Sequence, residues 1–297
     1  MSASPPEPRA WTRKDLRHTS AVVLIPPPSS WRDVQAVRAS RDKSYLRWMP
    51  HVNLLYPFVE DDEAGENFAR AARVAREALA SHAPFPCALS RRARFFEHRG
   101  SVTAWRAPED VDAIASSAPE ASSAEASSAP VSSARVAALQ AALESAFPFA
   151  DDLGAIGGDG FVPHLSVGQW RAVADADAFF AEALPTTDGE FPRPDAFHAD
   201  AVYLISRPSD VAPFRIRARV PLGGGEPVML PAPGGDGGGE GRGETRGGGA
   251  WWTRAAYRPP PPPPGAKCLE PKPKRSPRRG ARRRPRGAKR EWPQATD

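Results

Sequence analysis

The chain has 297 residues, enough for one large domain or two small ones, and its net charge of +5 is unevenly spread. Residues 223–297 carry 16 Lys and Arg against 7 Asp and Glu, whereas the preceding residues carry 24 against 28, so the basic charge belongs to the C-terminal part. The two isolated cysteines exclude a disulfide framework and a zinc cluster, and they fit an intracellular protein of the nucleus or cytoplasm. No apolar stretch reaches membrane-spanning length, and the N-terminus lacks the apolar region of a secretory signal.

The first half of the chain predicts strands and helices in alternation. Residues 1–18 are rich in proline and polar side chains and are expected to be loose. The elements predicted after them are a strand at 20–25, a helix at 29–42 capped by Ser29 or Ser30, a strand at 51–56, a helix at 61–82, and two strands at 85–98 and 101–107 joined by a hairpin turn at Arg99–Gly100. The inner face of the second helix is expected to consist of Phe68, Ala72, Ala75 and Leu79.

The second half starts with a repetitive Ala/Ser/Pro stretch at about 114–133, which predicts a flexible surface insert. The elements predicted after it are a helix at 133–147 with Val136, Leu139 and Leu143 inside, a strand at 161–170, a short helix at 175–185, and strands at 197–208 and 213–223. This order indicates an α+β fold of two related halves spanning residues 19–222.

Residues 223–297 are dominated by Gly, Pro and Arg and contain too few aliphatic side chains to form a core, so we expect a disordered tail. Within this tail, residues 271–290 carry 11 Lys and Arg, which fits binding to a nucleic acid backbone, a nuclear localisation signal, or both. An unselected, solvated low-complexity end is an equal alternative. The adjacent Trp251 and Trp252 are foreign to a linker and have no explanation in the sequence.

Two stretches share one pattern. "RWMPHVNLLYPF" contains His51 and Asn53, and "FVPHLSVGQW" contains His164 and Ser166. Residues i and i+2 of a strand share a face, so each histidine projects beside a small polar side chain while its apolar neighbours face a core. Two such strands facing each other would present two imidazoles and two hydrogen-bond donors to one ligand.

Histidine suits proton transfer because its ordinary pKa lies near 6.5. A neutral imidazole can take a proton from an attacking hydroxyl or water, an imidazolium can give one to a leaving oxygen, and the polar side chains can hold phosphate oxygens. A single histidine at the start of a strand is more often structural, and only the matched second copy favours catalysis. The sequence does not say which histidine is the acid and which is the base.

At these residues the chain resembles the two-histidine phosphoesterase superfamily, also called the 2'-5' RNA ligase superfamily, in its eukaryotic branch. "HVNL" and "HLSV" stand where that family has two His-x-(Ser/Thr)-x motifs. The resemblance implies a bilobal α+β fold in which two antiparallel sheets face a central cleft and helices pack outside. It also implies that His51 and His164 form the acid–base pair and that Asn53 and Ser166 bind phosphate, without a metal or another cofactor.

Two features depart from the family pattern. Asn53 replaces the usual hydroxyl residue, and the motifs are 113 positions apart, which the Ala/Ser insert largely explains. Tyr56 and Trp170 flank the motifs and could stack on a base, although packing against a neighbouring helix is the more common role of such residues.

The function expected from the sequence is a metal-independent phosphodiesterase that acts on 2',3'-cyclic phosphates or on 2',5'-linked RNA and nucleotides, by hydrolysis or by ligation. We expect a monomer with RNA or a nucleotide as its partner. The alternatives that remain are a non-catalytic RNA-binding protein, which Asn53 favours, and a scaffold that acts through its tail.

Overall fold

A five-stranded antiparallel sheet forms the larger lobe of the protein, in a computed structural model that describes residues 9–111, 133–155, 160–184, 189–192, 196–231, 251–253 and 257–261. Its strands, in spatial order, are β13 (Val228–Met229), β12 (Arg215–Pro221), β11 (Ala201–Ser206), β2 (Ser20–Leu24) and β3 (Val52–Leu55). The last of these, β3, is an edge strand and follows His51 directly.

The smaller lobe contains a three-stranded antiparallel sheet. Its strands, in spatial order, are β6 (Arg94–His98), β7 (Ser101–Arg106) and β9 (Leu165–Trp170). β6 and β7 form the predicted hairpin, in which Gly100 adopts a left-handed φ of 81° that glycine tolerates without strain. β9 is an edge strand and follows His164 directly, and it contacts β3 of the larger lobe.

Two further small sheets connect and extend the lobes. One contains β10 (Phe197–Ala199), β5 (Phe85–Leu89) and β8 (Pro108–Asp110), and the other contains β1 (Leu16–Arg17) and β4 (Phe58–Val59). The segments 85–98 and 197–208, each predicted as one strand, are therefore two strands in different sheets. The first breaks at residues 90–93, where the hydroxyl of Ser90 donates to the carbonyl of Arg92. The second breaks at Asp200, whose carbonyl accepts from the main-chain nitrogen of Leu222.

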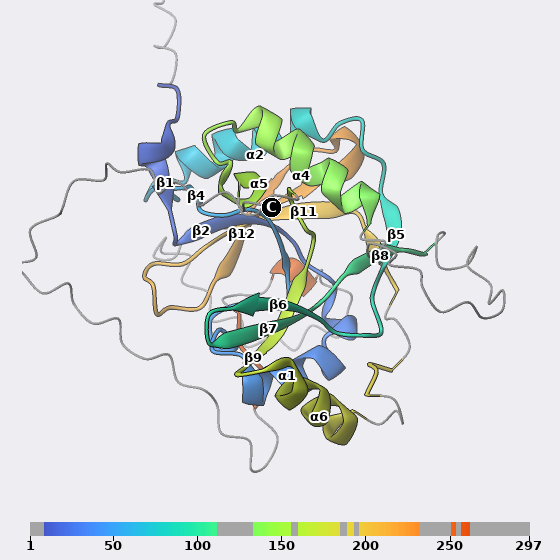
Figure 1. The fold of residues 1–297 in the computed structure, drawn as a ribbon. Coiled ribbons are helices and arrows are strands. Elements are labelled where there is room, and N and C mark those ends of the chain that lie inside the picture. The colour runs from blue at the N-terminus through green and yellow to red at the C-terminus, as the bar shows by residue number, and fades with distance from the viewer. Residues whose placement is uncertain are drawn as a thin grey trace, which may run out of the picture.

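Helices cover the outer sides of both lobes (Figure 1). α2 (Glu66–Ala78) and α4 (Ala134–Ala146) contact the five-stranded sheet, whereas α1 (Arg32–Arg41) and α6 (Val173–Ala183) contact β9; the short α5 (Asp152–Ala155) follows α4. The predicted inner faces of α2 and α4 are both buried. The capping prediction for the first helix is wrong, because the serines lie in a preceding 3-10 turn, Pro28–Ser30, and Trp31 occupies the cap without a side-chain bond.

The two faces of the five-stranded sheet belong to different apolar clusters. Val22 and Leu24 of β2 point into the main core under α2 and α4, whereas Ala21 and Val23 point the other way. The buried members of this second cluster are Ala21, Val23, Ile25, Trp48, Met49, Ala201, Tyr203, Ile205, Phe214 and Tyr257. Asn53 pairs with Val23 across β2 and β3, so its side chain belongs to the same face as the second cluster.

The described termini extend beyond the limits expected from the sequence. Residues 9–17 contact the domain through Trp11, whose indole packs 6.0 Å from Phe147, and through the pairing of β1 with β4. At the other end, β13 pairs with β12, and Tyr257 is only 7% exposed. Aromatic side chains stabilise both contacts, because Trp11 is partly buried and Tyr257 is buried against the domain, which the local composition did not predict. The basic stretch 271–290 lies outside the described residues.

The Ala/Ser insert also lies outside the described residues, apart from Ser133 at its end. Ser133 caps α4 by accepting from the main-chain nitrogen of Val136 at 3.2 Å. Its own main-chain nitrogen donates to the carbonyl of Pro108 at 2.8 Å, and its hydroxyl donates to the carboxylate of Asp110 at 2.5 Å. The end of β8 and the start of α4 are therefore held together at one point.

Candidate active site

His51 lies at the start of β3 and is fixed on two sides. Its Nδ1 is 2.7 Å from the carbonyl oxygen of Met49, two residues earlier in the chain. Its ring stacks on the indole of Trp48, with the ring centroids 4.4 Å apart and the planes inclined by 16°. Phe214 packs behind Trp48 at 3.9 Å, so the imidazole has a rigid aromatic support.

His164 is held in the same way at the start of β9. Its Nδ1 is 2.8 Å from the carbonyl oxygen of Val162, again two residues earlier. The rings of Phe96 and His164 are nearly perpendicular with their centroids 4.9 Å apart, and Trp105 stacks on Phe96 at 4.7 Å. Phe96 and Trp105 belong to the β6–β7 hairpin, so the smaller lobe supplies the aromatic support on this side.

The shared hydrogen bond determines how each imidazole meets a ligand. A carbonyl oxygen can only accept, so Nδ1 of each neutral ring carries the proton and donates it. Nε2 of each ring is then an acceptor when the ring is neutral and a donor when it is protonated. In both motifs a proline, Pro50 or Pro163, stands between the carbonyl and the histidine and restricts the backbone of this turn.

The pKa values of both histidines lie below the ordinary range. The pKa of His51 is lowered to about 4, chiefly by loss of water around the ring and in smaller part by the positive charge of Arg38. Burial likewise lowers the pKa of His164. The strands that directly follow the two histidines, β3 and β9, are in contact with each other.

The small polar partners differ between the two motifs. Asn53 lies in β3, and its Oδ1 is buried without a hydrogen-bond partner among the described residues. Ser166 is partly exposed in β9 and stands opposite Trp105 of β7. A buried amide oxygen without a partner is costly and is uncommon in folded proteins, so Oδ1 of Asn53 fits a position that a ligand hydroxyl could complete, whereas only Nδ2 of the same amide can donate to a phosphate oxygen.

The two aromatic residues proposed for base stacking have different surroundings. Trp170 is 7% exposed and packs between Phe179 at 5.5 Å and Phe180 at 5.2 Å, so it is a core residue of the α6 contact and has no open face for a base. Tyr56 is partly exposed, and the edge contact of its ring with Trp48 at 5.4 Å places it beside the His51 side of the site.

Sequence reasoning missed three aromatic residues that support the histidines: Trp48, Phe96 and Trp105. Trp48 lies within the first quoted stretch, three positions before His51, and this spacing was the only available signal. Phe96 and Trp105 are separated from His164 by more than 50 positions, and only the pairing of β7 with β9 brings them together.

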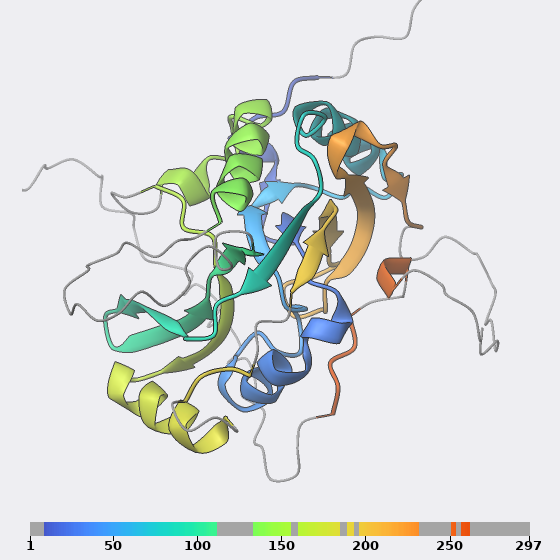
Figure 2. The same ribbon diagram turned by 90° about the vertical axis from the view of Figure 1, so that its right-hand side faces the viewer.

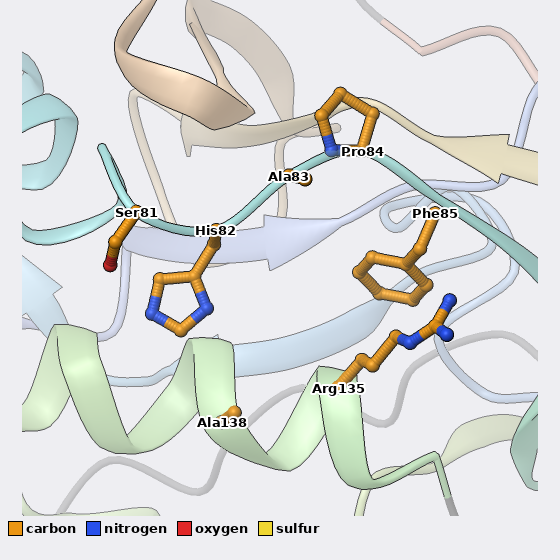
Figure 3. Close-up of a pocket in the computed structure, with 7 residues that line it drawn as sticks. All are labelled: Ser81, His82, Ala83, Pro84, Phe85, Arg135 and Ala138. Carbon is orange, nitrogen blue, oxygen red and sulfur yellow. The ribbon is translucent and has the colours of Figure 1, made fainter.

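A pocket of about 390 Å³ lies elsewhere, between the start of β5 and α4 (Figure 3). His82 and Arg135 line it, and neither motif histidine does. Among the described residues, no group of three or more His, Cys, Asp or Glu side chains could hold a metal ion. No helix in the same part of the chain is both long and apolar enough to cross a membrane.

Comparisons with known proteins agree with this arrangement at the level of the family. Residues 26–211 match the model of the 2'-5' RNA ligase superfamily, and this range contains both histidine motifs. No curated protein matches the chain.

Similar solved structures include a protein of Thermus thermophilus, with 16% identity over 70% of this chain and 99% of that chain and a TM-score of 0.37. Another is Escherichia coli LigT in complex with 3'-AMP, with 12% identity over 71% of this chain and 97% of that chain and a TM-score of 0.37. Because the family model covers more than half of the chain, including His51 and His164, the chain belongs to the 2'-5' RNA ligase superfamily.

Proposed function

We propose that the protein is a metal-independent phosphodiesterase acting on 2',3'-cyclic phosphate ends or 2',5'-linked RNA and nucleotides. His51 and His164 are the acid–base pair, and Asn53 and Ser166 bind the phosphate oxygens. The observation that carries this proposal is the repeated geometry of the histidines. Each donates Nδ1–H to the carbonyl two residues earlier, which leaves Nε2 of each ring to serve a ligand.

The reaction needs one proton acceptor and one proton donor. One neutral imidazole accepts the proton of a water or a 5'-hydroxyl as that oxygen attacks phosphorus, and the other, as imidazolium, gives its proton to the ribose oxygen whose bond to phosphorus breaks. Attack by water gives hydrolysis, and attack by a 5'-hydroxyl gives ligation. The base gains one proton and the acid loses one, so the two histidines have exchanged protonation states after the reaction. Proton exchange with solvent then restores the starting state.

The low pKa values shape this mechanism. Loss of water around both rings favours their neutral form. An anionic phosphate within hydrogen-bond distance favours the imidazolium form. The acid therefore takes up its proton from solvent when the anionic substrate binds, and the lowered pKa of the other ring keeps that ring neutral and available as a base.

The test is turnover of an oligonucleotide that ends in a 2',3'-cyclic phosphate, measured in EDTA. We expect His51→Ala and His164→Ala each to lower kcat by about a hundredfold or more. The double variant should be little worse than the poorer single variant, because the residues act as a unit. His98→Ala, which alters an exposed histidine of β6, is the matched control. Unchanged turnover in both single variants would falsify the proposal.

A non-catalytic RNA-binding role is the second candidate, and Asn53, which stands in the first motif where a hydroxyl residue is usual, favours it. In that case the site holds a phosphate end while the basic stretch 271–290 adds affinity for the backbone. Binding that weakens steeply with salt, without turnover of any cyclic-phosphate substrate, would select this role.

A further inference from the structure

The segment after the family match reaches the histidine site. Residues 257–261 run beside α1, shown in red next to the blue helix in Figure 2. The main-chain nitrogen of Tyr257 donates to the carbonyl of Phe214 at 3.1 Å, and the hydroxyl of Tyr45 donates to the carbonyl of Pro260 at 2.6 Å. Because the family match ends at residue 211, family membership does not predict this contact.

The Tyr257 side chain begins a chain of buried hydrogen bonds. Its hydroxyl accepts from the amide nitrogen of Gln35 at 2.6 Å. The amide oxygen of Gln35 accepts from Arg38 at 2.9 Å. The guanidinium of Arg38 is 2% exposed, and it also donates to the carboxylate of Asp42 at 2.7 Å and to the carbonyl of Trp48 at 2.8 Å.

This series of hydrogen bonds ends at Trp48, the residue on which the ring of His51 stacks. Arg38 donates to the main-chain carbonyl of Trp48, and the indole of Trp48 stacks on the imidazole of His51. The next residue, Met49, supplies the carbonyl that fixes Nδ1 of His51. Any displacement of the 48–49 backbone would therefore move both contacts that orient the ring.

We propose that Tyr257 is a positioning residue of the histidine site and acts on His51 through Gln35, Arg38 and Trp48. The effect on turnover rests on the function proposed above, whereas the effect on the orientation of the ring does not. By this inference, residues outside the matched family region complete the site.

The hydroxyl of Tyr257 sets which way the Gln35 amide points. A glutamine amide has a donor end and an acceptor end, and the Tyr257 hydroxyl and the Arg38 guanidinium fix one each. Without the hydroxyl, the buried amide nitrogen loses its acceptor, which favours rotation of the amide. Rotation would turn donor groups toward Arg38 and loosen its hold on the Trp48 carbonyl. A catalytic imidazole tolerates little displacement before its rate falls.

The experiment compares Tyr257→Phe with Tyr203→Phe in the full-length chain. Both variants remove a hydroxyl from a buried tyrosine of the second apolar cluster, and only Tyr257 belongs to the hydrogen-bond chain. Gln35→Met breaks the same chain one step further on. Variants of Arg38 are avoided because they would leave the buried carboxylate of Asp42 unpaired.

Two readouts are used at pH 7. The first is the NMR signal of the His51 ring, assigned with His51→Ala, and the second is kcat and KM on the cyclic-phosphate oligonucleotide. We expect Tyr257→Phe and Gln35→Met to shift the His51 ring signals and to lower kcat about threefold to tenfold at unchanged KM. Tyr203→Phe should change neither readout. His51 signals identical to those of the unmodified protein in both variants would overturn the proposal. If the unmodified protein has no turnover, the proposed function fails, and the ring signals alone decide this inference.

Discussion

Gly168 offers the sharpest test of how α1 packs against β9. It lies in β9, four residues after His164, where α1 packs against the strand. A methyl group at this position would come within 2.7 Å of Cβ of Arg41 and 2.8 Å of two ring carbons of Trp170. Ordinary contacts between carbon atoms are about 3.5–4.0 Å, so Gly168→Ala requires a displacement of about 1 Å.

Neither neighbour can move freely. The atom of Arg41 is Cβ, which is bonded directly to the helix backbone, and the ring of Trp170 packs against Phe179 and Phe180 of α6. The end of α1 must therefore move away from β9. Overpacking of this kind costs about 1–3 kcal/mol of unfolding free energy. The same shift would stretch the contacts of Gln169 with the segment after α1, where its side chain accepts from the main-chain nitrogen of Lys43 at 3.1 Å.

The assay is urea unfolding of Gly168→Ala beside Gly154→Ala. A methyl group at Gly154 would come equally close to another atom, 2.6 Å from a carboxylate oxygen of Glu144, but that oxygen ends a flexible side chain that can rotate away. We expect a loss of about 1–3 kcal/mol for Gly168→Ala and less than about 0.5 kcal/mol for Gly154→Ala. Equal stability of the two variants would refute the reasoning that α1 and β9 are in rigid contact here.

Three further predictions concern single side chains. Between pH 7 and pH 4 the unfolded chain takes up a proton on His51 before the folded protein does, because the ordinary pKa of 6.5 exceeds the folded value of about 4. Folding should therefore lose up to about 3 kcal/mol over this range, and His51→Phe should show a shallower decline in urea unfolding; parallel declines would contradict this. Asn53→Leu should lower kcat/KM about tenfold to a hundredfold without loss of thermal stability, because the amide oxygen has no protein partner to lose among the described residues; a large fall in melting temperature would contradict this. Trp170→Ala should cost about 3–5 kcal/mol of unfolding free energy, whereas Trp170→Phe should leave KM unchanged; a raised KM in the phenylalanine variant would restore the stacking role.

Much of the fold follows from local patterns. The helical spacing of Phe68, Ala72 and Ala75 predicted the buried face of α2, and the turn at Arg99–Gly100 predicted the β6–β7 hairpin, and the structure confirms both. The errors arise where a strand changes sheet. Residues 85–98 and 197–208 are each continuous in β-forming residues, and only long-range pairing divides them between sheets.

The candidate site was predictable only in its polar residues. A motif of histidine and a small polar residue is visible within five positions of sequence, so His51 and His164 could be chosen before the structure was known. Their supports depend on distant segments. Gln35 and Tyr257 are 222 positions apart, and no local pattern marks the hydrogen bond between them. The packing of Trp251 and Trp252 against the second cluster likewise depends on a sheet face formed by much earlier residues.

The bonds from Ser133 to Pro108 and Asp110 have a practical consequence for engineering. These bonds hold the start of α4 next to the end of β8. The relative position of these two elements therefore does not depend on how many residues stand between Asp110 and Ser133. The entropy of joining two fixed points by a chain grows only slowly with the number of residues between them. A fluorescent reporter or an affinity domain whose own ends lie close together should be accepted within 114–132, and new termini opened there should leave both lobes intact.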